Sequence, residues 1–215
     1  MVSLRPIPVS ATLLKMLLLW LATASGSLSE NITSLDHFEL FGEAERSSTG
    51  SIRLTHDGYE HSSGGMYAQS KVGPHWEFRI LLNAHGRKNN GGKGLAFWYT
   101  REPPHSGPLL GGPDIFNGLV VTFFSDEPNG SASSDTKEAG WIGAFFNDGG
   151  PFDYQELKHG RNRRNSCKCA FRNHLLNDRG PTLIYLTYDG ATLEGHVSEP
   201  QESTFRPCFT LHDIE

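Results

Sequence analysis

Short apolar runs separated by turn residues dominate the pattern of the chain. Four of them are predicted strands, each bounded by Gly, Pro, Asn or Asp, at residues 76–82, 94–100, 118–124 and 141–146. The last three are apolar at almost every position, which is typical of strands buried between two layers. No segment repeats apolar residues at the helical spacing i, i+3, i+4, i+7. The pattern therefore predicts an all-β fold, either a sandwich or a barrel.

A β-hairpin is predicted at residues 182–197. The runs TLIYLTY and ATLEGHV flank Asp189-Gly190, a dipeptide that suits a type I′ turn. Long polar segments separate the other predicted strands, at 101–117, 125–140 and 147–166. Loops of this length in a compact domain are usually either functional or disordered. These segments hold most of the polar residues that could converge on a ligand.

The N-terminal segment has the pattern of a secretory signal peptide. Arg5 supplies the positive charge, residues 13–21 (LLKMLLLWL) form a short apolar stretch, and small residues follow. We predict a signal peptide at 1–24, a linker at 25–37 and one domain at 38–215. No later stretch is apolar enough to span a bilayer, so the expected location is the lumen of the secretory pathway.

Composition and cysteine content narrow the class of protein. The net charge of −5 and the pI near 6.0 give no electrostatic reason to expect nucleic acid as a partner. In an oxidising compartment, Cys167, Cys169 and Cys208 predict one disulfide and one free thiol. Asn31 and Asn129 begin the sequons Asn-Ile-Thr and Asn-Gly-Ser and are predicted glycosylation sites.

Patterns for catalysis are missing from the sequence. It contains no Glu-x-Asp-x-Glu strand, no Gly-x-Ser-x-Gly elbow and no His-Glu-x-x-His helix. A secreted glycosidase is therefore only a minor alternative. The segment SDEPNG at 125–130 offers oxygen ligands that suit calcium, but an acidic surface turn has the same composition. The basic run GRNRRNSCK at 160–168 is either a docking patch for a protein partner or a solvated loop.

Four segments resemble, in fixed order, the L-type (legume-like) lectins of the early secretory pathway. They are GGKGLAFWYTREPPHSGPLLGG at 91–112, FNGLVVTFFSDEPN at 116–129, NDGGPFDYQ at 147–155 and SCKCAFRN at 166–173. The resemblance covers about residues 38–210. It implies a jelly-roll sandwich of two antiparallel sheets with the sugar site on the concave side. It also implies a cargo receptor that binds high-mannose glycoproteins during ER-to-Golgi vesicle transport, a binding module and not an enzyme.

Five residues take on roles through this resemblance. Lys93 lies between glycines where the family has an aspartate that accepts hydrogen bonds from mannose, and Tyr154 lies where it has a histidine. Asn129 matches a residue that contacts both sugar and metal. Ser125 and Asp153 match calcium ligands, although Ser125 replaces an aspartate. The resemblance thus implies a sugar site of Lys93, Asn129 and Tyr154 and a calcium site of Ser125, Asn129 and Asp153.

The resemblance also implies a disulfide between Cys167 and Cys208, which leaves Cys169 free. After the second of these cysteines the family continues with a glycine-rich loop, a final strand and usually a membrane anchor, and none of these follows here. The fold is therefore expected to be incomplete at its C-terminus. Membrane attachment is expected only through a region missing from this chain.

The substitution at Lys93 decides the functional prediction. An ammonium group donates hydrogen bonds and cannot accept them, so both the charge and the hydrogen-bonding sense of the site are reversed. We predict that calcium-dependent mannose binding is weak or lost. One alternative places the ammonium where calcium normally lies, which would make binding indifferent to a chelator. Another is a pseudo-lectin that binds a protein partner through residues 160–168.

Overall fold

The structure is a computed structural model that describes residues 2–4, 35–48, 50–56, 62–68, 71–84, 94–102, 105–124, 141–153, 166–170, 180–198, 203–212 and 214. Apart from one 3-10 turn, η1 (Leu35–His37), the regular elements of this part of the chain are all β-strands. Every strand pair in it is antiparallel. The predicted all-β class is confirmed.

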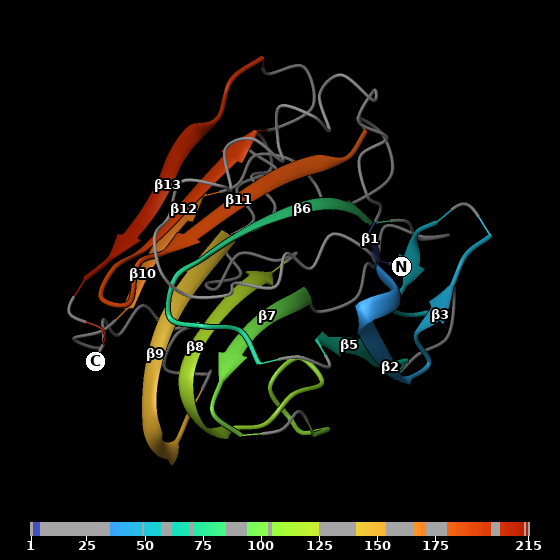
Figure 1. The fold of residues 1–215 in the computed structure, drawn as a ribbon, viewed down its shortest axis with the longest axis horizontal. Coiled ribbons are helices and arrows are strands. Elements are labelled where there is room, and N and C mark those ends of the chain that lie inside the picture. Colours follow the sequence, from blue (N-terminus) through green and yellow to red (C-terminus); the bar gives the residue numbers. More distant parts are fainter. Residues whose placement is uncertain are drawn as a thin grey trace, which may run out of the picture.

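Two large sheets lie face to face (Figure 1). The seven-stranded sheet has the order β13 (Arg206–Leu211), β12 (Leu193–Ser198), β11 (Thr182–Tyr188), β6 (Trp76–Ala84), β1 (Val2–Leu4), β4 (Ile52–Arg53) and β3 (Glu45–Arg46). The four-stranded sheet has the order β10 (Ser166–Ala170), β9 (Trp141–Pro151), β8 (Ile115–Phe124) and β7 (Gly94–Thr100). A separate pair, β2 (Phe38–Gly42) and β5 (Gly64–Ala68), lies at one side of the sandwich.

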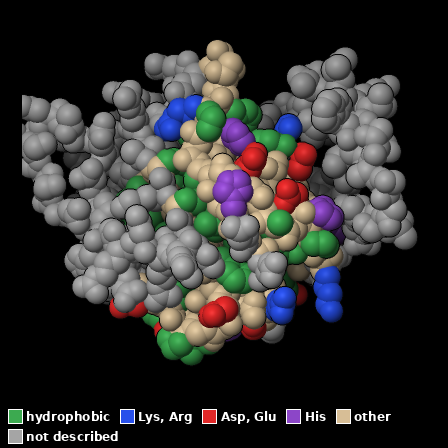
Figure 2. Space-filling model, turned by 90° about the vertical axis from the view of Figure 1, so that its left-hand side faces the viewer, with side chains coloured by type: hydrophobic (Ala, Val, Ile, Leu, Met, Phe, Trp, Pro, Cys, Tyr) green, Lys and Arg blue, Asp and Glu red, His purple; other side chains and the backbone are tan. Residues whose placement is uncertain are grey.

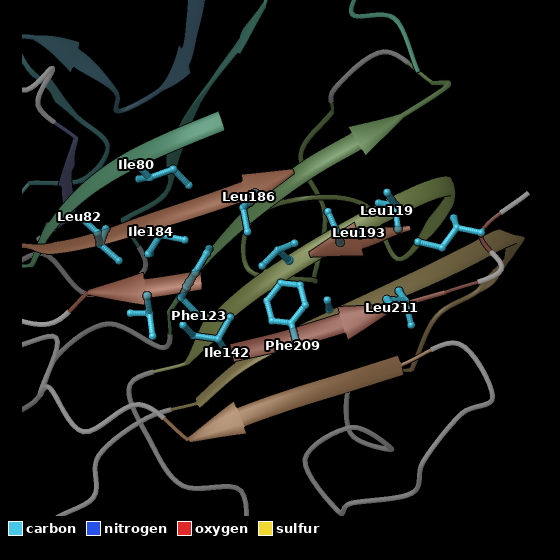
Figure 3. Packing of buried hydrophobic residues seen from close by; sticks show 14 residues of the cluster. Ile80, Leu82, Leu119, Phe123, Ile142, Ile184, Leu186, Leu193, Phe209 and Leu211 are labelled. Atoms are coloured by element: carbon cyan, nitrogen blue, oxygen red, sulfur yellow. The ribbon is translucent and has the colours of Figure 1, made fainter. Parts of the chain in front are cut away.

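The inner faces of the two sheets share one core. Along β11, Ile184 and Leu186 are buried while Leu183 and Tyr185 are partly exposed, as the two-residue period of a strand requires. Figure 3 shows these side chains meeting Phe123 and Ile142 from the opposite sheet. The buried residues of this cluster are Ile80, Leu82, Leu119, Val121, Phe123, Ile142, Ala144, Ile184, Leu186, Leu193, Val197, Phe209, Leu211 and Ile214.

The outer face of the four-stranded sheet is also buried, which explains why its strands are apolar at almost every position. On β8 the adjacent residues Val120 and Val121 point to opposite faces, yet both are fully buried. The outer cluster consists of Leu109, Phe116, Val120, Trp141, Phe145 and Phe152. Part of its cover is a tight turn at 107–112, in which Leu109 is bridged to Gly112. A Cβ on Gly112 would lie 2.5 Å from the Trp98 ring, so only glycine fits there.

The predicted hairpin is confirmed as β11 and β12, but its turn differs from the expected type. Tyr188 pairs with Leu193, so the loop comprises residues 189–192. Gly190 has φ +95°, whereas a type I′ turn also needs a positive φ at Asp189, which is not among the positive-φ residues. Instead, the Asp189 carboxylate accepts hydrogen bonds from the N–H groups of Ala191 (2.9 Å) and Thr192 (2.7 Å). These bonds lower the pKa of Asp189.

The four other predicted strands correspond to β6, β7, β8 and β9, and all but β7 are longer than expected: β6 extends by two residues to Ala84, and β8 and β9 extend further. β8 begins at Ile115 and β9 ends at Pro151, and these two residues pair with each other. Parts of the predicted loops 101–117 and 147–166 are therefore strand. β1 lies within the predicted signal peptide and pairs with β4 and β6. The other residues of that predicted leader lie outside the described part of the chain.

Candidate functional site

Most of the predicted site falls outside the described residues. This applies to Lys93, Ser125, Asn129 and Tyr154, and to the predicted glycosylation site at Asn31. Their roles stay predictions. The strand ends that carry two of them are described, and these ends locate one edge of the four-stranded sheet as the candidate site.

Lys93 and Ser125 adjoin strand ends that pair with each other. Gly94, the first residue of β7, pairs with Phe124, the last residue of β8. In an antiparallel pair the start of one strand and the end of the next lie at the same edge of the sheet. The chain therefore enters β7 and leaves β8 at neighbouring positions of this edge.

The backbone at this edge leaves room only for glycine. Gly94 has φ +152°, and a Cβ built on it would lie 2.2 Å from the carbonyl oxygen of Phe123. Close approach of the two strands thus gives a physical reason for one of the glycines that flank Lys93.

A stacked aromatic pair supports the same edge. Phe124 pairs with Trp141 across β8 and β9, and their rings stack at 4.3 Å between centroids. These two residues flank the segment 125–140, which contains the predicted ligands Ser125 and Asn129. The apolar runs predict the two strands but not the contact between their terminal rings. The position of two aromatic residues at the two ends of one polar segment was the signal that could have revealed it.

Asp153 follows the opposite end of β9. The N–H of Phe152 donates a hydrogen bond to the carbonyl oxygen of Asp114 (2.6 Å), just before β8 begins. The Phe152 ring is buried against Phe116, whereas Asp153 itself is exposed. The ten residues of β8 separate the two ends of the sheet by roughly 30 Å. The described residues therefore do not bring Asp153 together with the strand ends next to Lys93 and Ser125.

The three predicted calcium ligands carry little negative charge. Within the part of the chain that the structure describes, no group of three or more His, Cys, Asp or Glu side chains could hold a metal. Of the predicted ligands Ser125, Asn129 and Asp153, only one is a carboxylate, whereas calcium takes six to eight oxygen ligands, with carboxylates prominent among them. A serine in place of an aspartate removes one negative charge from the set.

The predicted disulfide is wrong in one partner. The structure joins Cys169, not Cys167, to Cys208, with 5.3 Å between the Cα atoms, and leaves Cys167 free. The bond links β10 and β13, which are edge strands of the two sheets. Both cysteines of β10 face the core, so the register between the strands, and not the direction of the side chain, selects the partner. A motif comparison carries no information on that register.

A β-bulge lies next to the disulfide. Gly195 pairs with Phe209, but the next residue, His196, pairs with Pro207, so Cys208 is the extra residue on β13. Bulges commonly re-aim a side chain at the edge of a sheet. Here Cys208 packs with the core cluster, beside the edge strand of the other sheet.

The described surface in Figure 2 carries charged side chains of both signs. Acidic, basic and histidine side chains lie scattered among hydrophobic ones on the described surface. Among the described residues, no helix is long and apolar enough to cross a membrane. Of the basic run 160–168, the first six residues lie outside the described part and the last three begin β10.

Comparison with known proteins gives the family. The family model described as "Legume-like lectin family" matches residues 24–215. The vesicular integral-membrane protein VIP36 of Homo sapiens is 31% identical over 125 residues, which cover 57% of this chain and 34% of that protein. Protein ERGIC-53 of Rattus norvegicus is 27% identical over 156 residues, 70% of this chain and 28% of that protein. The matched regions thus span about a third of these relatives.

Solved structures show the same fold. The VIP36 exoplasmic/lumenal domain in its Ca2+/Man3GlcNAc-bound form superposes with a TM-score of 0.66 and 21% identity, covering 82% of this chain and 72% of that one. The legume lectin-like domain from Entamoeba histolytica gives a TM-score of 0.63 and 21% identity, covering 84% and 76%. The two antiparallel sheets are those of a lectin sandwich, and the chain belongs to the legume-like lectin family.

Proposed function

We propose that this chain is a carbohydrate-binding domain of the early secretory pathway whose sugar site is degenerate. Its inherited ligands are high-mannose N-glycans on glycoprotein cargo, and its inherited place is the lumen between the ER and the Golgi. The relatives support this proposal, because solved forms of the VIP36 domain hold mannose oligosaccharide and Ca2+. A lectin family also makes the chain a binding module and not an enzyme.

One observation supports the proposal that the sugar site is degenerate. Lys93 lies between Gly92 and Gly94 in the sequence. The backbone of Gly94 lies against Phe123 at the edge of the sheet. A carboxylate at that position could accept hydrogen bonds from sugar hydroxyls, whereas an ammonium group cannot. The cation also repels a calcium ion bound nearby. We therefore expect calcium-dependent mannose binding to be weak or lost.

The other predicted site residues also favour weak or lost mannose binding. Asn129 is retained, but it begins a sequon and is itself a predicted glycosylation site, so an attached glycan would compete for the space of a bound one. Tyr154 replaces a histidine of the family pattern. Ser125 replaces a calcium-binding carboxylate. Each change removes one acceptor, charge or contact that the inherited ligand used.

A glycan array followed by calorimetry of the secreted protein, with calcium and with a chelator, tests the proposal. Absent or millimolar binding in both conditions is the expected result. Micromolar, calcium-dependent binding of mannose oligosaccharides would refute the loss of function. Chelator-insensitive binding that Lys93→Ala abolishes would place the ammonium in the position of the metal ion.

A protein-binding role has a separate outcome. A partner captured in excess mannose and chelator, and lost when Arg161, Arg163 and Arg164 are neutralised, would assign the chain as a pseudo-lectin. Neutralising Arg79 and Arg206 on the seven-stranded sheet is the control for charge alone.

A further inference from the structure

Three cysteines meet at one side of the sandwich, although only two are bonded. Cys167 and Cys169 are two residues apart on β10, so their side chains point to the same face of the strand. Both pack against the core cluster, as does Cys208 on β13. Three sulfur atoms therefore lie at the junction of the two edge strands.

The free Cys167 lies two residues from the bonded Cys169 along β10. Two residues of a strand span about 6.6 Å, and a disulfide accommodates Cα separations of roughly 4.4–6.8 Å. The present bond has a Cα separation of 5.3 Å. A displacement of a few ångströms along β10 would thus bring Cys167 within bonding range of Cys208.

Two features of the edge strands permit such a displacement. Within the described residues, β10 is hydrogen-bonded only to β9, and β13 only to β12, so each strand has one constrained side. Cys208 is also the extra residue of the β-bulge, where the ladder is already interrupted. A shift there breaks fewer backbone hydrogen bonds than a shift in the middle of either sheet.

We propose that Cys167, Cys169 and Cys208 form an exchangeable set, in which Cys208 is bridged either to Cys169 or to Cys167. The Cys167 thiolate attacks the sulfur of Cys208, a new S–S bond forms, and the Cys169–Cys208 bond breaks. Cys169 leaves as a thiolate and takes up the proton that Cys167 gave to solvent. No oxidant or reductant is consumed, because one disulfide and one thiol are present before and after the step.

Burial keeps this exchange slow at neutral pH. Burial raises the pKa of the Cys167 thiol to about 11, and the thiol donates a weak hydrogen bond to the carbonyl oxygen of Ala144 (4.0 Å). Only the thiolate attacks a disulfide. The Cys169 form therefore persists after folding, and the rate of exchange rises with pH until Cys167 is ionised.

The choice of cysteine sets the position of β10. Ala170, at the end of this strand, pairs with Trp141 of β9, and Trp141 stacks on Phe124 at the start of segment 125–140. Exchange would therefore displace the neighbour of the strand ends that flank this segment. The exchange itself does not depend on sugar binding.

Trypsin distinguishes the two bridges, because Lys168 separates the two cysteines. Secreted wild-type protein is incubated without oxidant at pH 8, 9 and 10. Free thiols are then blocked in acid with N-ethylmaleimide, and the digest is analysed by mass spectrometry. Residues 165–168 (NSCK) contain Cys167, and residues 169–172 (CAFR) contain Cys169. We expect the first peptide to become linked to Cys208 with time, about tenfold faster for each pH unit.

Two controls make the result decisive. The rate must be independent of protein concentration, since exchange within one molecule is unimolecular, and Cys167→Ser must keep the Cys169–Cys208 bridge unchanged. In a second variant, Cys169→Ser, we expect a Cys167–Cys208 bridge after secretion. A wild-type protein that keeps only Cys169–Cys208 after a day at pH 10 would overturn the proposal, as would free Cys167 and Cys208 in a folded Cys169→Ser variant.

Discussion

The two sides of the sandwich are closed in different ways. On one side, the edge strands β10 and β13 are joined by the Cys169–Cys208 bond. On the other side, the edge strand β7 packs against β6 and β11 without a covalent link, mainly through aromatic rings, and Leu95 also contacts the core cluster. Trp76 contacts Phe97 (5.4 Å between centroids), Tyr99 (5.5 Å) and Tyr188 (5.7 Å).

The difference shows which contacts a sequence motif can predict and which it cannot. The aromatic side depends on several rings from the predicted strands. Removing one ring should therefore reduce the stability of the packing without separating the two sheets. The covalent side depends on one pair of sulfur atoms, and a change of two residues in register selects another pair. β7, whose first residue Gly94 follows Lys93 in the sequence, lies on the non-covalent side.

Removing the disulfide has the largest expected effect. The bond closes a loop with a sequence separation of 39 residues, which corresponds to about 4 kcal/mol in the chain-entropy description. We expect the double variant Cys169→Ala/Cys208→Ala to lose about that much free energy of unfolding in a urea titration. Cys167→Ala is the matched control and should lose far less. Equal losses in both variants would mean that the covalent link does not hold this side together.

Truncation of Trp76 comes next. We expect Trp76→Ala to reduce the free energy of unfolding by about 3 kcal/mol, because three ring contacts are lost at a half-buried site. Trp76→Phe should cost less than about 1 kcal/mol. The indole N–H is buried without a hydrogen-bond partner among the described residues, so replacing it removes a penalty that offsets part of the lost area. If both variants lost the same amount in urea titrations, the closure would depend on the indole itself.

The two tyrosine hydroxyls, of Tyr99 and Tyr188, should have the smallest effects. The hydroxyl of Tyr99 donates a hydrogen bond to the carbonyl oxygen of Gly73 (3.0 Å), whereas the hydroxyl of Tyr188 donates to Gly190 within its own hairpin loop (2.9 Å). We expect Tyr99→Phe to cost about 1 kcal/mol in urea unfolding and Tyr188→Phe to cost less, because only the first bond joins two distant segments.

The free energy of unfolding at alkaline pH gives a second test of the Tyr99 hydroxyl. Burial raises the pKa of Tyr99 above its usual value of 10.0, so its protonated form is favoured in the folded state. The stabilisation is present below pH 10 and is lost as the pH rises through the folded-state pKa. The difference between wild type and Tyr99→Phe should therefore shrink in strong alkali. If the difference in free energy of unfolding between the two proteins stayed constant with pH, this hydroxyl would not be the source of the stabilisation.

The sequence predicted the parts of the fold that depend on the alternation of side chains. β6 to β9, β11 and β12 follow from their apolar runs, because a period of two and burial between layers leave a clear pattern. The turn at Asp189 was predicted with the wrong geometry, since the carboxylate takes over hydrogen bonds that the dipeptide rule does not consider. The outer cover of the four-stranded sheet, where Leu109, Phe116 and Trp98 share one cluster, was not predicted, because tertiary contacts define it.

The sequence predicted the strand that begins at Gly94, and the backbone of this glycine lies against Phe123. The roles of the candidate site residues stay predictions. The pairing of Cys169 with Cys208 was not predictable, because the strand register and the bulge on β13 are properties of the assembled sheets. The grouping of Asp153 with Ser125 rests on the resemblance and stays a prediction.

The central claim is that Lys93 has replaced the acceptor that calcium-dependent mannose binding requires. Calorimetry of a high-mannose oligosaccharide, with calcium or chelator, tests it on the wild type, Lys93→Asp and the charge-matched control Lys71→Asp. We predict at most millimolar affinity, independent of calcium, for the wild type and the control, and at least tenfold tighter, calcium-dependent binding for Lys93→Asp. Micromolar, calcium-dependent binding by the wild type would contradict the account.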